Sequence, residues 1–116
     1  MITYNTAKTK PKHFLALTSV HVEEFEYLLD SFAPRSDRYF RYHTWQGKKR
    51  KYPRFTPQAD ESLADPADQL LFLLMYLKNN PLQDFHAALF GISQGWVSQR
   101  VHRLLVLLNQ TLTGLG

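Results

Sequence analysis

The chain has 116 residues, of which 44% are hydrophobic, and a formal net charge of +4. This length suits one small domain with one core. The lack of cysteine excludes a disulfide framework and a thiolate metal site. The longest apolar run, residues 70–77, has eight residues, fewer than the ~18 that indicate a membrane span. The lysine-bearing N-terminus lacks the apolar core of a signal peptide. We therefore expect a soluble, cytoplasmic protein.

The N-terminal part predicts an arm followed by a helix. Residues 1–13 are polar and lysine-bearing, and we expect a mobile basic arm there, either simply solvated or in contact with DNA. A helix is predicted over residues 19–32. Thr18 or Ser19 can cap its start, and Pro34 is expected to end it.

Basic residues are concentrated in the middle of the chain. From Arg35 to Arg54 there are eight of them against one acid, so this segment has an excess of seven positive charges while the remainder sums to minus three. Such a patch is typical of a protein that binds a polyanion. Aromatic residues are interleaved through the segment 34–57, and we expect a loop or hairpin tip that reaches phosphates. The alternative is a solvated charge run with the aromatics in the core. The predicted phosphate-contacting residues are Lys48, Lys49, Arg50, Lys51, Arg54 and, farther along, Arg100.

Three further helices are predicted at 66–79, 81–90 and from 94 to about 111. Asp65 can cap the first, which is apolar nearly all round and therefore buried. The second and third are separated by Gly91, because a glycine just past a helix end supplies a left-handed conformation. Two helices joined by a short glycine-containing turn form a helix-turn-helix.

These elements predict an all-α fold. It consists of an N-terminal helix, a basic aromatic loop and a three-helix unit over 66–111 that contains the helix-turn-helix. We expect one helical domain over residues 14–116, which is the part of the chain that follows the arm.

The last helix of this unit has polar residues at its start. With Val97 in the core, a rotation of 100° per residue turns several of them outward. The early part of the second helix of a helix-turn-helix enters the major groove, where glutamine suits adenine and arginine suits guanine. The predicted base-contacting residues are Gln94, Gly95, Ser98, Gln99, His102 and Arg103. For Trp96, core packing is favoured over a DNA-stacking wedge or a partner contact.

Nothing in the sequence indicates a metal or a cofactor. The histidines show no metal-ligand spacing, so no metal site is predicted. Gly91 has no phosphate-loop context, so no nucleotide cofactor is predicted.

A family resemblance rests on two stretches and the basic loop between them. They are FLALTSVHVEEFEYLL and LLFLLMYLKNNPLQDFHAALFGISQGWVSQRVHRLL. Together they resemble the N-terminal region of insertion-sequence transposases, in which a helix-turn-helix precedes a DDE-type endonuclease domain. The likeness covers about residues 14–108. It implies sequence-specific binding of double-stranded DNA at the terminal inverted repeats of a mobile element, and hence association with the nucleoid.

The resemblance does not bring catalysis with it. In the family, acidic residues of a separate ribonuclease H-like domain hold two metal ions that act on the DNA. No such set of acids can be matched in this chain. We therefore expect a DNA-binding chain that is not itself an enzyme, with a catalytic domain supplied in cis or in trans.

Two other functions fit the same residues. A stand-alone helix-turn-helix transcription regulator would share the surface and recognise a promoter site. A helical interaction module would pair two chains as a homodimer through an apolar face from Leu104 to Leu115. The DNA sequence bound and the molar mass in solution distinguish these functions.

Overall fold

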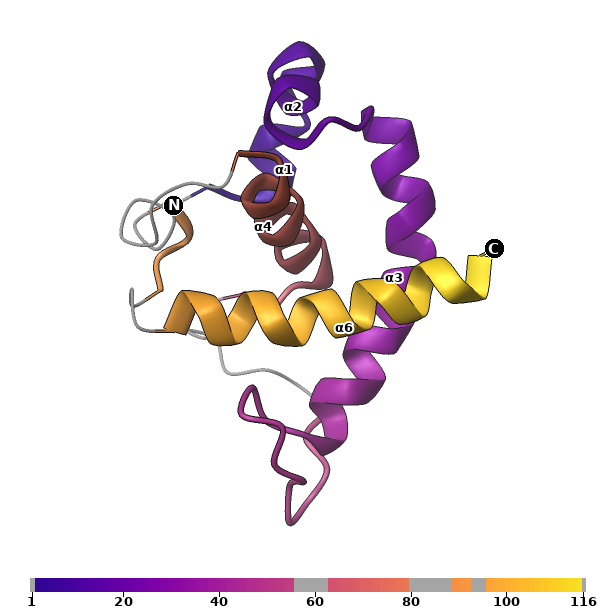
Figure 1. Ribbon diagram of the computed structural model, residues 1–116, viewed down its shortest axis with the longest axis vertical. Helices are drawn as coiled ribbons and strands as arrows, with labels where there is room; N and C mark the ends of the chain where they lie inside the picture. Colours follow the sequence, from indigo (N-terminus) through magenta and orange to yellow (C-terminus); the bar gives the residue numbers. More distant parts are fainter. Residues whose placement is uncertain (1, 56–62, 80–88, 93–95, 116) are drawn as a thin grey trace.

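A computed structural model describes residues 2–55, 63–79, 89–92 and 96–115. Within these ranges there are five helices: α1 (Tyr4–Ala7), α2 (Pro11–Thr18), α3 (Val22–Tyr42), α4 (Pro66–Asn79) and α6 (Val97–Leu115). The long helix α6 lies across α3 and α4, while α1 and α2 pack at the other end of α4 (Figure 1). The all-α prediction is confirmed. In the described part of the chain, no helix is both long and apolar enough to cross a membrane.

The N-terminal residues pack on the core, so the structure contradicts the mobile arm predicted for 1–13, from residue 2 onward. Tyr4 is 5% exposed, and its ring stacks on Phe25 with centroids 4.6 Å apart. Its backbone N–H donates to Asp68 Oδ1 at 2.8 Å. The predicted boundary after residue 13 falls inside α2. One buried tyrosine among lysines gives no periodic signal, which is why the sequence favoured an arm.

Helix α3 differs at both ends from the helix predicted over 19–32. Ser19 has a left-handed φ of 66° and ends α2 instead of capping α3. The start of α3 is capped at His21, whose backbone N–H donates to Glu24 Oε1 at 2.8 Å. Pro34 does not end the helix, which continues to Tyr42.

The continuation of α3 past Pro34 has an energetic explanation. A proline inside a helix costs about 3 kcal/mol. The extra turns bury Ser36 and bring Tyr39 and Phe40 against the core. Full burial of an aromatic side chain contributes roughly 1.5–3 kcal/mol. Tyr39 and Phe40 are each half-buried, so together they contribute about as much as the proline costs.

Helix α4 forms the centre of the core and matches its predicted bounds. Asp65 caps it, because the Ala67 backbone N–H donates to Asp65 Oδ1 at 2.8 Å. The prediction that this helix is buried nearly all round is confirmed for its middle, since the four consecutive side chains from Leu70 to Leu73 are fully buried. Near its end, Leu77 is 49% exposed.

The glycine corner of the predicted helix-turn-helix is present. Residues 89–90 are helical, and Gly91 then takes a φ of 67°, as expected for a residue just past a helix end. Phe90 is buried, and its ring packs edge-on against Phe72 with centroids 5.1 Å apart. The rest of the predicted helix 81–90 and the start of the helix predicted from 94 lie outside the described residues.

Most of the apolar residues of α6 pack in or against the core. Leu104, Leu107 and Leu108 are all buried, so they are not available for the pairing of two chains expected over Leu104 to Leu115. The exposed apolar residues of α6 are Val106, Leu112 and Leu115. At 100° per residue, Val106 and Leu115 lie on opposite sides of the helix. The three therefore do not form one continuous apolar stripe.

Candidate nucleic-acid interface

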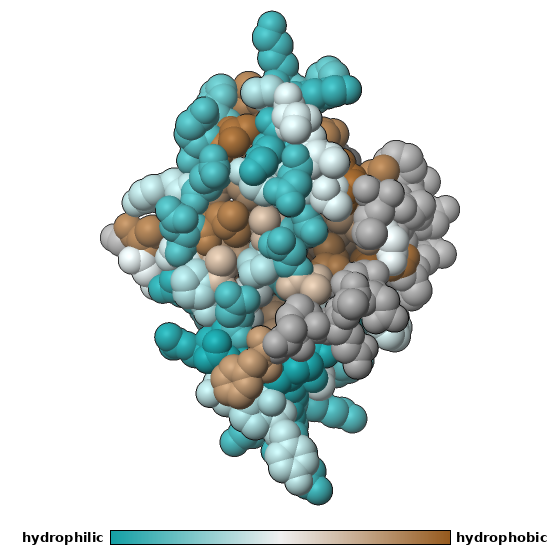
Figure 2. Space-filling model, turned by 180° about the vertical axis from the view of Figure 1, so that it is seen from behind, coloured by the Kyte–Doolittle hydropathy of each residue, from teal (hydrophilic) through white to brown (hydrophobic). Residues whose placement is uncertain are grey.

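The chain turns back after α3 in a hairpin of residues 43–54, here called the basic hairpin. His43 and Lys49 form an antiparallel bridge, and the Arg50 backbone N–H donates to the Tyr42 carbonyl at 2.7 Å. At the tip, Gly47 has a φ of 84°. The predicted segment 34–57 is therefore helical up to residue 42 and a hairpin over residues 43–54, while residues 56–57 lie outside the described residues. The hairpin lies at the lower end of the molecule (Figure 1), and this end is largely hydrophilic when seen from behind (Figure 2).

The predicted phosphate-contacting residues of the hairpin fall into two groups. Lys48, Lys49 and Lys51 are exposed. Arg50 is half-buried, and its Nε donates to the Phe40 carbonyl at 2.9 Å, so this guanidinium also fixes the hairpin to α3. Arg54 is half-buried at the base of the hairpin. The three lysines are thus the hairpin cations best placed to meet an external anion.

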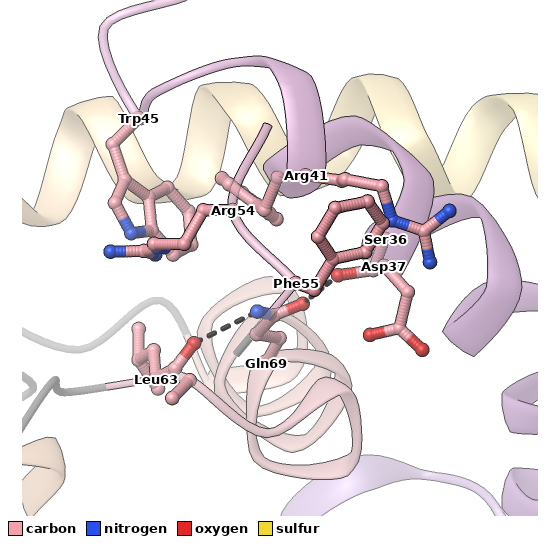
Figure 3. A pocket seen from close by; sticks show the side chains of 10 residues that line it. Ser36, Asp37, Arg41, Trp45, Arg54, Phe55, Leu63 and Gln69 are labelled. Atoms are coloured by element: carbon pink, nitrogen blue, oxygen red, sulfur yellow. Dashed lines mark hydrogen bonds between the residues drawn. The ribbon is translucent and has the colours of Figure 1, made fainter. Parts of the chain in front are cut away.

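A pocket of about 200 Å³ lies at the base of the hairpin, between α3 and the start of α4 (Figure 3). Below it, the Ser36 hydroxyl donates to Gln69 Oε1, and Gln69 Nε2 donates to the Leu63 carbonyl at 2.8 Å. All three residues are buried. A buried polar network with its partners in place holds its elements in one arrangement. The hairpin therefore starts from a rigid junction between α3 and α4.

Three stacked side chains join the hairpin to α6. The Arg100 guanidinium carbon lies 4.6 Å from the ring centroid of Trp45 and 4.4 Å from that of Trp96. Arg100 is 5% exposed, and this burial contradicts the phosphate contact predicted for it. The two indole faces supply cation–π attraction to the buried charge. Trp96 is 50% exposed, so its predicted core packing is wrong, and Trp45 is the buried tryptophan of the stack.

Arg103 provides a second link between hairpin and helix. Its guanidinium carbon lies 5.6 Å from the Tyr39 ring centroid, and its Nε makes a long hydrogen bond of 3.4 Å to the Trp45 carbonyl. A Cβ atom added to Gly47 would lie 2.6 Å from Arg103 Nη2. The tip of the hairpin therefore rests against the first turns of α6, and both lie on one part of the molecular surface.

Three other predicted base-contacting residues, Ser98, Gln99 and His102, lie on the same part of α6 as Arg103. Val97 is fully buried, as expected, and Ser98 and His102 are exposed. Gln99 is half-buried, with its Oε1 accepting from Arg100 Nη1 at 2.9 Å. Residues three and four apart are neighbours on a helix surface, so Ser98, Gln99, His102 and Arg103 form one polar patch, from which the buried Arg100 is excluded. Gln94 and Gly95 lie outside the described residues.

The sequence contained one local signal for the stack that was missed. Trp96 and Arg100 are four residues apart, a spacing that brings side chains together on a helix. The other half of the stack had no such signal, because Trp45 comes from a distant part of the chain. Among the described residues, no group of three histidines and acids is placed to hold a metal ion.

Part of the chain matches a known protein family. Residues 61–114 match the family described as the helix-turn-helix of DDE superfamily endonuclease. The match includes α4, the Gly91 corner and nearly all of α6, and it leaves out α1, α2, α3 and the basic hairpin. No curated protein and no solved structure matches the chain. The family resemblance seen in the sequence is confirmed for this part of the chain.

Proposed function

We propose that the chain binds double-stranded DNA as part of a transposase, at the terminal inverted repeats of a mobile element, because residues 61–114 match the family described as the helix-turn-helix of DDE superfamily endonuclease. The observation that carries the proposal is the contact of the basic hairpin with the start of α6 through Trp45, Arg100 and Arg103. This contact brings the exposed lysines of the hairpin and the polar patch of α6 onto one surface. Lysines attract phosphates of any sequence, and the polar patch of α6 can read base edges.

In the proposed complex, the first turns of α6 enter the major groove. This groove is about 12 Å wide and admits a helix. Gln99 would pair with adenine and Arg103 with guanine, while Ser98 and His102 add hydrogen bonds to neighbouring bases. Arg103 is already held by Tyr39 and the Trp45 carbonyl, so less conformational entropy is lost when it binds. Gln94 and Gly95 remain predicted contacts.

The exposed lysines of the hairpin would contact the sugar-phosphate backbone at the edge of the same groove. Such contacts fix the register of a protein on the duplex without reading its sequence. We further propose that strand cleavage is carried out by a DDE-type catalytic domain, in cis or in trans. The present chain then supplies target recognition in association with the nucleoid.

The test of the hairpin uses two matched triple variants. One replaces the exposed lysines of the hairpin with glutamine, and the other replaces three exposed lysines near α1 and α2. The first set is Lys48, Lys49 and Lys51, and the control set is Lys8, Lys10 and Lys12. Both lower the net charge by the same amount, but in different parts of a molecule 43 Å long. Screening acts over about 8 Å at physiological salt.

We expect the hairpin triple to lose affinity for every duplex and to flatten the plot of log affinity against log salt. Removing three lysine–phosphate pairs should lower that slope by about 3. The control triple should keep the wild-type slope. Fluorescence anisotropy with a labelled duplex measures both quantities. Equal losses in the two variants would contradict a specific role for the hairpin.

The target is identified by selecting duplexes from a random pool. Enrichment of a sequence that forms the ends of a mobile element would support the transposase proposal. Enrichment of a promoter-like site away from any such end would favour the stand-alone regulator.

A further inference from the structure

We propose that a second groove, between the C-terminal half of α3 and the middle of α6, binds one strand of the sugar-phosphate backbone of the same duplex. The groove has a volume of about 330 Å³. Its polar lining comes from Arg35, Arg38, Tyr42, His43 and Gln110, and Leu107 contributes an apolar wall. The inference rests on the proposed function and adds to it a binding site formed by residues of α3, which the family match does not reach.

The chemistry of this groove suits a phosphodiester. Arg38, Tyr42 and Gln110 are exposed, and they offer a guanidinium, a phenol hydroxyl and an amide as hydrogen-bond donors. Most protein–DNA hydrogen bonds go to the backbone from donors of these kinds. Among the described residues that line the groove, none is acidic. The planar fork of an arginine matches a phosphate better than an ammonium does.

The pocket at the base of the hairpin differs from this groove in the charges that line it. Arg41 lines it one turn after Arg38 on the same helix, but Asp37 lines it too. The Arg41 guanidinium lies 5.0 Å from the Phe55 ring centroid. An acid and an aromatic ring therefore already accompany the charge of Arg41, and that pocket is the poorer site for an anion.

Arg35 is held in place at the far end of the groove. Its Nη1 donates to the Ser31 carbonyl at 3.0 Å and to the Ser31 hydroxyl at 2.7 Å. Its Nη2 faces Gly114 near the end of α6, where a Cβ atom would collide with it. An arginine fixed in this way binds an anion with little further loss of side-chain freedom.

The groove is adjacent to the proposed reading surface because both share Tyr39. The Tyr39 ring is stacked on His43, with centroids 4.8 Å apart, and Arg103 lies over the same ring. Seven residues separate Arg103 from Gln110, which is about 10 Å along α6. The two residues lie on the same side of α6, because seven residues turn the helix through about two full turns. When the first turns of α6 occupy the groove of the DNA, Gln110 and Arg38 lie where the flanking backbone passes.

The first test compares Arg38→Gln with Arg41→Gln. These variants remove the same charge from the same helix, one turn apart. We expect Arg38→Gln to weaken binding to specific and random duplexes by the same factor, about fivefold at 0.15 M salt, because removing one cation from a phosphate lowers the salt slope by about 0.9. We expect Arg41→Gln to bind as the wild type does. Circular dichroism melting checks that both variants are folded.

The second test locates the DNA directly. The chain has no cysteine, so one cysteine introduced at an exposed position can carry an iron–EDTA reagent that cuts nearby DNA backbone. Gln110→Cys places the reagent at the groove without removing an arginine, and Lys12→Cys places it in α2. We expect cutting of the backbone beside the bound site from position 110 and none from position 12.

The outcomes separate the two proposals. A wild-type chain that binds no duplex would overturn the proposed function. If the wild type binds, but Arg38→Gln keeps its affinity or position 110 gives no cutting, the groove inference is overturned and the proposed function stands. That result would leave the groove to another anion, such as an acidic segment of a partner protein.

Discussion

Gly47 at the tip of the basic hairpin gives a quantitative test of how the hairpin positions Arg103. Its φ of 84° lies in the left-handed region, which costs a residue with a Cβ about 1–2 kcal/mol. An added Cβ would also lie 2.6 Å from Arg103 Nη2 and 3.2 Å from its Cζ. Nη2 is the end of a flexible side chain, so the guanidinium can move aside at low cost. We predict that Gly47→Ala lowers stability by about 1 kcal/mol, chiefly through the backbone.

The two effects of this substitution can be measured separately. A decrease of about 1 kcal/mol in stability lowers the Tm of a domain of this size by roughly 4 °C. Displacing Arg103 should cost about 1–3 kcal/mol of discrimination between the selected duplex and a random one. Gly47→Asn is the matched control, because asparagine adopts the left-handed conformation more readily. It should show a smaller decrease in Tm than the alanine variant and the same decrease in discrimination.

A double variant completes the test. In an Arg103→Ala background, Gly47→Ala should still lower the Tm, but it should cause no further loss of discrimination because the displaced side chain is already absent. Melting followed by circular dichroism and anisotropy with the two duplexes supply the data. Wild-type discrimination in Gly47→Ala, or a loss that adds fully to that of Arg103→Ala, would refute the proposed coupling.

Three further predictions concern other parts of the surface and the core. Gln99→Ala should cost about 1–3 kcal/mol at particular base pairs, and equal losses on selected and random duplexes would show that Gln99 does not read bases. Arg100→Ala should loosen the hairpin, because it removes the cation–π interaction with Trp45, which contributes roughly 0.5–2 kcal/mol. Unchanged hydrogen exchange of the Gly47 amide would argue against this role of Arg100 in holding the hairpin. Burial raises the pKa of the Asp68 carboxyl above 3.8, although the hydrogen bond from the Tyr4 backbone N–H opposes the shift. Because the folded state favours the neutral acid, the contribution of Asp68 to the free energy of unfolding is greatest at low pH. It is lost as the pH rises through the folded pKa of Asp68. Asp68→Asn keeps an acceptor for Tyr4, so the Tm of this variant should lack that decline, and an identical decline in both proteins would rule out Asp68 as its source.

Features fixed by short-range signals were predictable from the sequence. The cap at Asp65 and the proline after it define the start of α4, and Gly91 follows the helical residues 89–90. Each depends on the conformational preference of one or two residues, which needs no knowledge of the rest of the fold. The exposed lysines of the hairpin were predictable in the same way, because a dense charge run is rarely buried.

Features that depend on packing between distant segments were not predictable. Pro34 stands inside α3 because residues beyond it reach the core, and Tyr4 is buried because Phe25 lies against it. The roles of Trp96 and Arg100 are nearly exchanged relative to expectation, with the tryptophan half-exposed and the arginine buried. The four-residue spacing of Trp96 and Arg100 indicated their contact, but the burial of Arg100 could not be inferred without Trp45, which comes from the hairpin.

The central claim is that the basic hairpin and the first turns of α6 form one DNA-binding surface. The most direct measurement is the change in backbone amide NMR signals of the labelled chain when the selected duplex is added. The largest shifts are expected over residues 44–51 and 97–106, with α2 unaffected. Shifts confined to α1 and α2, or shifts in α6 with none in the hairpin, would contradict the claim.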